Sequence, residues 1–153
     1  MQTQVMFYLL PDEEKADTSN ISPSSAFFHA CLQASYFYRQ NQRVFIYTQD
    51  QKSAEQVDEL LWAFDSDSFV PHNLAGEGPK QGAAVEISHQ APRGRRPVLI
   101  NLSNTVPDFA GQFQLIVDFV PSDETLKQLA RERFKACRQF GFTVDNQAIA
   151  KIE

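Results

Sequence analysis

Short apolar runs alternate with segments of helical periodicity along most of this chain, and this alternation limits the possible folds more than any single motif does. The runs Val5–Leu10 and Arg43–Thr48 lack regular polar alternation, which is typical of strands covered on both faces. After each run, apolar residues recur at helical spacing. Strands and helices in this order predict a parallel α/β sheet.

The predicted helices have residues at their ends that favour those positions. Ser22-Pro23 supplies an N-cap and a proline for the first helical turn, and Asp50 is an N-cap for a helix over Gln51–Ala63. A last helix is predicted from Ser122 to about Phe140, where Gly141 suits a left-handed backbone. Three further strands are predicted at Ala83–Ile87, Arg96–Leu102 and Gln114–Val120.

The length of 153 residues fits one domain with one hydrophobic core, over residues 1–153. We therefore expect a Rossmann-like α/β sandwich with a mostly parallel central sheet of about five strands and helices on both faces. No repeat or polar linker divides the chain.

The charge and the cysteines exclude some classes of function. A net charge of −5 argues against direct binding of nucleic acid over a broad face, since phosphate neutralisation supplies most of that affinity. Cys31 and Cys137 lie in helix-like segments without CxxC spacing, as expected for reduced core thiols in a cytoplasmic protein. The N-terminal apolar run is short and lacks a basic leader, so we expect no targeting or membrane-spanning segment.

The loop GEGPKQG, Gly76–Gly82, invites a phosphate-binding interpretation but does not fit one well. Lys80 follows Pro79 and precedes Gln81, whereas a P-loop needs Gly before its lysine and Ser or Thr after it. A strand is predicted to follow the loop, so no helix N-terminus is available for a phosphate. The glycines are better explained by a tight connection, although a small nucleotide-binding protein or enzyme that uses this loop remains the alternative.

Other catalytic and cofactor signatures are also missing. The turn after the first strand contains no glycine, so a dinucleotide fingerprint is absent from its required place. His29, His72 and His89 have no metal-ligand spacing, and no nucleophile is paired with a carboxylate. We therefore expect no catalytic, cofactor-binding or metal-ligating residues.

The last predicted helix has a basic stripe that contains an aromatic residue. At about 100° per residue, one face carries Lys127, Arg131, Phe134, Lys135 and Arg138. The stripe is either the solvated face of an amphipathic helix, with the ring tucked onto a strand, or a pocket for an apolar group beside an acid. Arg133 falls among the core-facing residues, where we expect it to pair with a carboxylate such as Asp118.

The only tryptophan, Trp62, lies one step away from the inward positions Leu60 and Leu61. It either closes the core at the end of its helix or stands outside with Phe69 and Val70 as an apolar patch. An exposed patch of that kind would need a protein partner.

Three long motifs together resemble one protein family. These are DELLWAF, SFVPHNLAGEGPKQGAAVEI and DFVPSDETLKQLARERFKACRQFGF, and the likeness extends over essentially the whole chain, including FYLL in the first strand. The sequence is similar to the chi subunits of bacterial DNA polymerase III. The resemblance implies an accessory subunit of the clamp loader without its own catalytic site or cofactor, acting in DNA replication.

The resemblance also implies two partners. One is the psi subunit, which links chi to the clamp loader and for which the family uses aromatic residues that match Trp62 and Phe69; a helicase is a possible competitor. The other is the acidic C-terminal tail of the single-stranded-DNA-binding protein, which ends in proline and phenylalanine. The matching tail-binding residues are Val120, Lys127, Arg131, Phe134 and Lys135. This chain departs from the family at Phe134, where chi subunits carry tyrosine, so a hydroxyl contact is lost and the apolar wall is kept.

Overall fold

The computed structural model describes residues 3–10, 25–63, 70–75, 83–92, 94 and 96–148. The strands are β1 Gln4–Leu9, β2 Val44–Thr48, β3 His72–Leu74, β4 Val85–Ser88, β5 Val98–Leu102, β6 Leu115–Val120 and β7 Thr143–Ala148. The helices are α1 Ser25–Arg39, α2 Gln51–Ala63, the short 3₁₀ helix η1 Ala110–Gln112 and α3 Glu124–Gln139.

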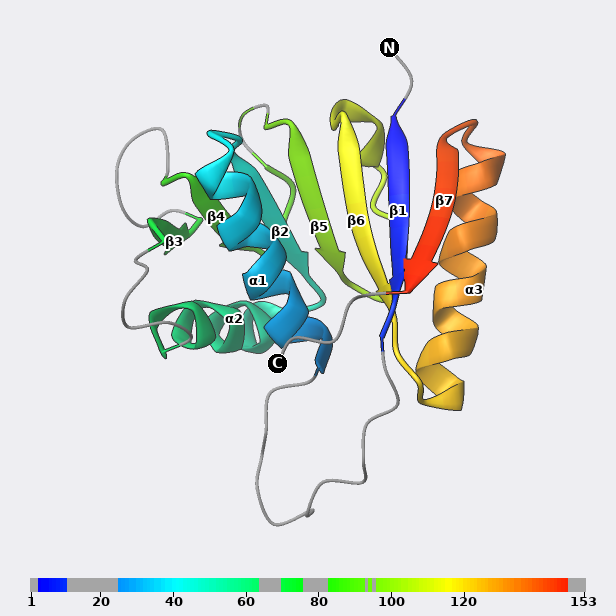
Figure 1. Cartoon of the computed structure of the whole chain (residues 1–153), viewed down its shortest axis with the longest axis horizontal. Coiled ribbons are helices and arrows are strands. Elements are labelled where there is room, and N and C mark those ends of the chain that lie inside the picture. Colours follow the sequence, from blue (N-terminus) through cyan, green and yellow to red (C-terminus); the bar gives the residue numbers. More distant parts are fainter. Residues whose placement is uncertain are drawn as a thin grey trace.

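The strands form one sheet in the order β3-β4-β2-β5-β6-β1-β7 (Figure 1). Every neighbouring pair in the sheet is parallel, which confirms the predicted parallel α/β architecture. The sheet has seven strands rather than about five, because β3 and β7 give little sequence signal. β3 is only three residues long, and β7 reads TVDNQA, a polar edge strand whose residues are exposed or half-buried.

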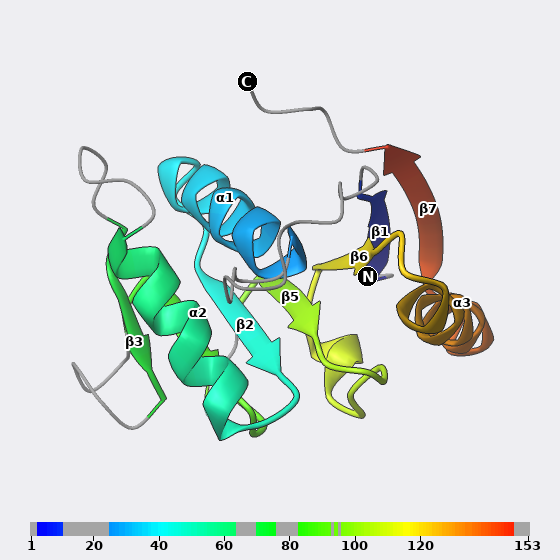
Figure 2. The ribbon, with the colours of Figure 1, turned by 90° about the horizontal axis from the view of Figure 1, so that it is seen from below.

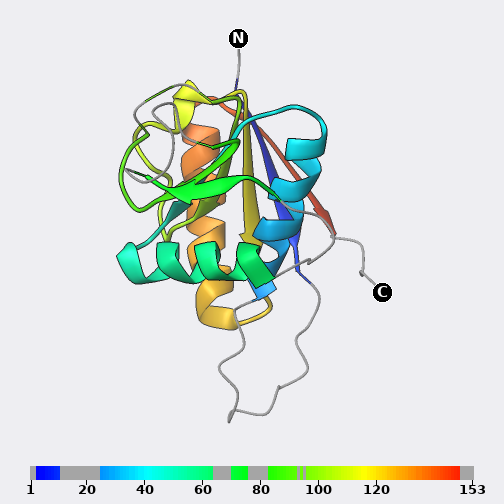
Figure 3. The ribbon, with the colours of Figure 1, turned by 90° about the vertical axis from the view of Figure 1, so that its left-hand side faces the viewer.

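Helices cover both faces of the sheet, as predicted. Figure 3 shows α1 and α3 on opposite sides of the strands. Alternate residues of β2 point to the two faces: Val44 and Ile46 join the core beneath α1 and α2, and Phe45 joins the core beneath α3 and η1. Each face of the central strands is therefore fully buried, which explains their continuous apolar sequence.

The ends of the helices follow the predicted signals closely. α2 has the predicted bounds, and the Asp50 carboxylate accepts a hydrogen bond from the N–H of Ser53 at 2.8 Å. α3 begins two residues later than Ser122, because Asp123 is its N-cap and accepts from the N–H of Leu126 at 3.0 Å. Gly141 follows α3 with φ +84°, as its left-handed position requires. The predicted helix start at Ser22-Pro23 lies outside the described residues.

Cys31 on α1 and Cys137 on α3 are both buried, which confirms that they are core thiols. Burial raises the pKa of each thiol to about 12. No helix in the described ranges combines the length and apolar character needed to cross a membrane.

Candidate functional site

A groove of about 600 Å³ lies between α3 and the end of the sheet that contains β6, β1 and β7. All five residues predicted to bind the tail line this groove: Val120, Lys127, Arg131, Phe134 and Lys135. The four helical residues lie on one side of α3, because Arg131 follows Lys127 by four residues, and Phe134 and Lys135 follow Arg131 by three and four. Val120, the last residue of β6, faces α3 from the sheet, since it packs against the core beneath that helix.

The groove is also lined by residues that the sequence did not indicate. Phe7 and Leu9 come from β1, and Asn146 from β7. They reach the groove because β1 lies between β6 and β7. One sequence signal was available: Phe7 and Leu9 occupy alternate positions of the first apolar run and therefore point to the same face of the sheet. In the structure Phe7 is buried, whereas Leu9 is 41% exposed.

Phe134 packs onto the sheet and also lines the groove. Its half-buried ring is tucked onto β1, with its centroid 5.3 Å from that of Phe7, and it also lines the groove. The guanidinium carbon of Arg138 lies 6.0 Å from the centroid of the same ring. Phe134 is therefore held in place while part of its surface faces the groove.

Basic side chains rim the groove. Arg131 and Lys135 are exposed, and Lys127 is half-buried. The Nζ atom of Lys127 lies 3.9 Å from Oε1 of Glu124, an exposed pair of a kind that contributes little stability. The groove thus combines an apolar floor with a positive rim, an arrangement that suits an apolar group carrying or adjoining a carboxylate.

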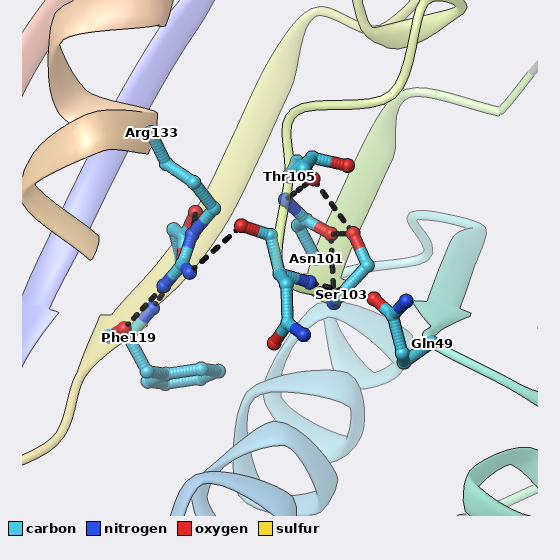
Figure 4. Close-up of polar contacts among 8 residues, drawn as sticks. Gln49, Asn101, Ser103, Thr105, Phe119 and Arg133 are labelled. Carbon is cyan, nitrogen blue, oxygen red and sulfur yellow. Dashed lines mark hydrogen bonds and ion pairs between the residues drawn. The ribbon is translucent and has the colours of Figure 1, made fainter. Parts of the chain in front are cut away.

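Arg133 points away from this rim and into the protein, as predicted. Its guanidinium donates two hydrogen bonds to the Asp118 carboxylate, Nε to Oδ2 at 2.9 Å and Nη2 to Oδ1 at 3.0 Å. It also donates to the carbonyl of Phe119 at 3.2 Å and to that of Asn104 at 3.4 Å (Figure 4). Complete burial raises the pKa of the Asp118 carboxyl, and the charge of Arg133 opposes that effect.

A network of polar side chains holds the segment after β5 in place beside this pair. The side-chain oxygen of Asn101 accepts a hydrogen bond from the N–H of Ser103. The Ser103 hydroxyl, which has one proton to donate, lies 2.7 Å from both that oxygen and the carbonyl of Thr105 (Figure 4). The N–H of Asn104 donates to Gln49 after β2. Arg133 therefore connects α3 to β6 and to a fixed segment at the carboxyl ends of the strands.

Trp62 stands at the surface rather than closing the core. It is 60% exposed, whereas Leu61 is buried and Leu60 half-buried. Its ring lies 4.7 Å from the ring of His72 on β3. Phe69, the predicted companion of Trp62, lies outside the described residues, and Val70 is buried.

Among the described residues, no group of three or more His, Cys, Asp or Glu side chains is placed to hold a metal ion. The glycine loop Gly76–Gly82 lies outside the described residues, so its nucleotide-binding alternative stays a prediction.

The fold and the groove define a Rossmann-like α/β protein with a groove rimmed by basic side chains beside α3. Residues 1–145 match the family described as DNA polymerase III chi subunit, HolC. The chain belongs to this family of subunits of the DNA polymerase that acts in replication.

Relatives in two bacteria agree with this assignment. The chain is 46% identical over 141 residues to DNA polymerase III subunit chi of Escherichia coli (strain K12), covering 91% of this chain and 93% of that protein. It is 40% identical over 122 residues to the protein of the same name from Haemophilus influenzae (strain ATCC 51907 / DSM 11121 / KW20 / Rd), covering 78% of this chain and 85% of that one.

The fold also resembles a chain in the crystal structure of T4 UvsW, with a TM-score of 0.60 and 9% sequence identity. The likeness covers 97% of this chain but only 41% of that chain. At this identity it supports the α/β architecture alone.

Proposed function

We propose that this chain is a non-catalytic accessory subunit that captures the acidic C-terminal tail of the single-stranded-DNA-binding protein in the α3 groove. The observation that carries the proposal is the convergence of three basic side chains on an apolar floor. Lys127, Arg131 and Lys135 surround Phe134 and Val120 in one groove. A tail that ends in phenylalanine offers the matching groups, a terminal ring and neighbouring carboxylates.

The roles of the groove residues follow from their chemistry. The terminal ring of the tail packs against Phe134 and Val120, while its carboxylates pair with Arg131 and the two lysines. Exposed charge pairs are weak and salt-sensitive, so binding should weaken as ionic strength rises. Weak single contacts suffice, because a binding protein with several tails raises the effective concentration of the tail.

The second part of the proposal concerns attachment to the clamp loader. The Trp62 surface, together with Phe69, binds the psi subunit in the cytoplasm, and a helicase competes for the same surface. The support for this role is the 60% exposure of Trp62, since exposed tryptophan is enriched among residues that dominate binding energy. The chain would thus tether single-stranded DNA coated by its binding protein to the clamp loader, as a single folded domain without direct nucleic-acid contact.

Calorimetric titration with a peptide copying the tail tests the groove. Arg131→Ala should weaken binding about tenfold or more, because a charged hydrogen-bond partner is removed. Arg39→Ala is the matched control, since Arg39 is an exposed arginine at the end of α1 and outside the groove. Equal affinity for wild type and Arg131→Ala, or no binding by wild type, would contradict tail capture here.

Co-purification with the psi subunit tests the second surface. Trp62→Ala should abolish the complex while leaving tail binding intact. Tyr36→Ala provides a control with a comparable exposed aromatic residue, 56% exposed on α1. Loss of both activities in Trp62→Ala would indicate misfolding, and retention of psi would place its site elsewhere.

A further inference from the structure

The outer face of α2 carries acidic side chains around Trp62. At 100° per residue, Glu55, Asp58 and Glu59 all fall within about 60° of Trp62 on the helical wheel. Glu55 and Glu59 are exposed, and Asp58 is half-buried. Lys52 is the only basic residue of α2, and it lies ten positions before Trp62. The tryptophan therefore projects from a face that is negative along its length.

These two glutamates are not neutralised within the described part of the chain. No lysine or arginine there forms an ion pair with Glu55 or Glu59, and Glu55 accepts only a side-chain hydrogen bond from Gln51 at 3.3 Å. The charges on this face are thus available to a partner.

A buried histidine lies beneath the tryptophan and next to one of the carboxylates. The side chain of His72 is only 1% exposed, and its Nδ1 lies 2.7 Å from the carbonyl of Val70, to which it donates. Among the described residues, its Nε2 has no hydrogen-bond partner, and it lies 3.5 Å from Oδ1 of Asp58. The Trp62 ring meets the His72 ring at 60°. His72 therefore supports the surface from below and positions the indole.

We propose that the surface formed by Trp62, Glu55, Asp58 and Glu59 binds a basic segment of a partner protein, with an arginine or lysine side chain over the indole. Tryptophan is the aromatic residue that attracts a cation most strongly, and neighbouring carboxylates add charged hydrogen bonds. The same charges repel an acidic tail of the kind proposed for the α3 groove, so they also separate the two partners. This inference rests on the proposed role of the Trp62 surface and specifies the chemistry of its partner.

Because Trp62 is the only tryptophan, its fluorescence reports directly on this surface. The full chain is titrated with three synthetic decapeptides that alternate leucine with arginine, glutamine or glutamate. The arginine peptide should change Trp62 emission saturably, and the other two should have little effect. Glu55→Gln with Glu59→Gln should weaken the response to the arginine peptide about five- to tenfold, as expected for the loss of two exposed ion pairs.

The matched control removes the same charge from another helix. Glu124→Gln with Glu132→Gln neutralises two exposed glutamates on α3. It should change the affinity for the arginine peptide less than about twofold, since both double variants reduce the long-range attraction between the protein and the peptide equally. Glutamine is as good a helix former as glutamate, so both variants should fold. Equal weakening in the two variants, an equal response to the glutamine peptide, or no response to the arginine peptide would each overturn the proposal.

Binding of the psi subunit to Trp62→Ala separates this inference from the proposed function. If Trp62→Ala no longer binds psi but the wild-type chain does not prefer the arginine peptide to the other two, the psi surface stands and the proposal of a basic partner segment is wrong. If the peptide binds selectively but psi is retained by Trp62→Ala, the basic-segment site stands and psi binds elsewhere.

Discussion

α2 and α3 lie towards opposite ends of the sheet (Figure 2). Each helix presents an aromatic residue among charged side chains, but the charges have opposite sign, and one ring lies in a groove whereas the other projects. α3 sets a half-buried Phe134 in a groove rimmed by cations. α2 sets an exposed Trp62 on a face with three carboxylates. A groove can receive the end of a peptide, whereas a projecting ring must be covered by a surface of its partner.

The comparison also shows why the net charge of −5 is a poor guide to partners here. Charges on the surface are screened over about 8 Å at physiological ionic strength, so a partner responds to the local sign. α3 has five basic side chains against two acidic ones, although the whole chain is acidic. One protein can therefore bind an acidic and a basic segment at separate surfaces.

The largest expected effect concerns the buried pair of Arg133 and Asp118, which connects α3 to the sheet. Arg133→Met should lower the free energy of unfolding by about 3 to 5 kcal/mol, because it leaves the Asp118 carboxylate buried without its partner. Arg131→Met on the exposed side of the same helix should change it by less than about 0.5 kcal/mol. Urea denaturation of the two variants measures the difference.

A double variant tests the cause of that effect. Arg133→Met combined with Asp118→Leu removes both charges and should recover much of the lost stability. If Arg133→Met is as stable as Arg131→Met, the buried pair is not what holds α3 on the sheet, and the groove must depend on apolar packing alone.

A second prediction concerns the reactivity of the buried thiols Cys31 and Cys137, which also reports whether a surface variant is folded. Burial, and for Cys137 also the charge of Asp118, raises the thiol pKa from 9.0 to about 12. At pH 8 the folded chain should therefore hold about a thousandfold fewer thiolates than the unfolded chain, so alkylation by iodoacetamide should be correspondingly slow. Rapid labelling of the native protein would contradict this.

The raised pKa of the two thiols also determines how the stability of the folded chain changes with pH. Well below pH 9.0 both thiols are protonated in both states, so their contribution is unchanged there. As pH rises from 9.0 towards 12, only the unfolded chain loses these protons, and stability falls. A cysteine pair replaced by alanine should show a weaker decline across this range in thermal unfolding.

A smaller effect is expected where α3 turns into β7. Gly141→Ala should cost about 1 to 2 kcal/mol, because φ is +84° and alanine disfavours a left-handed backbone. Apart from its chain neighbours, no described residue has an atom within 4 Å of an added Cβ, so the effect comes from the backbone. Gly111→Ala is the control: its Cβ would make an ordinary contact of 3.8 Å with Phe142. Equal melting temperatures for the two variants would contradict the prediction.

The smallest predicted effect is at the start of α3. Asp123→Ala should reduce stability by about 1 kcal/mol, since the N–H of Leu126 loses its capping acceptor. Asp123→Asn keeps an acceptor and should retain most of the stability. If calorimetry shows alanine and asparagine to be equivalent, the cap contributes little and α3 is placed by its packing.

Local periodicity made much of the fold predictable. α2 was bounded correctly by its cap and its apolar spacing, and the wheel of α3 placed Arg133 on the inner side, where it meets Asp118. The prediction missed two strands for a physical reason. β3 is short and β7 is a polar edge strand, so neither needs the apolar sequence of a buried strand.

In the groove, too, some residues could be predicted from the sequence and others could not. Its helical residues could be grouped from spacing, and their resemblance to the chi family suggested the ligand. Phe7, Leu9 and Asn146 could not be added, because they join the groove only through the order β6-β1-β7. That order pairs segments far apart in the chain, which no local pattern encodes.

The amino-acid sequence by itself determined the parallel α/β class, the basic stripe of α3 and the acidic composition of α2, since helical and strand periods assign residues to faces locally. Only the tertiary structure decided that Phe134 lies in a groove and that Trp62 projects to the solvent. Both outcomes depend on which strand lies beside each helix: β1 brings Phe7 under Phe134, and β3 brings His72 beside Trp62.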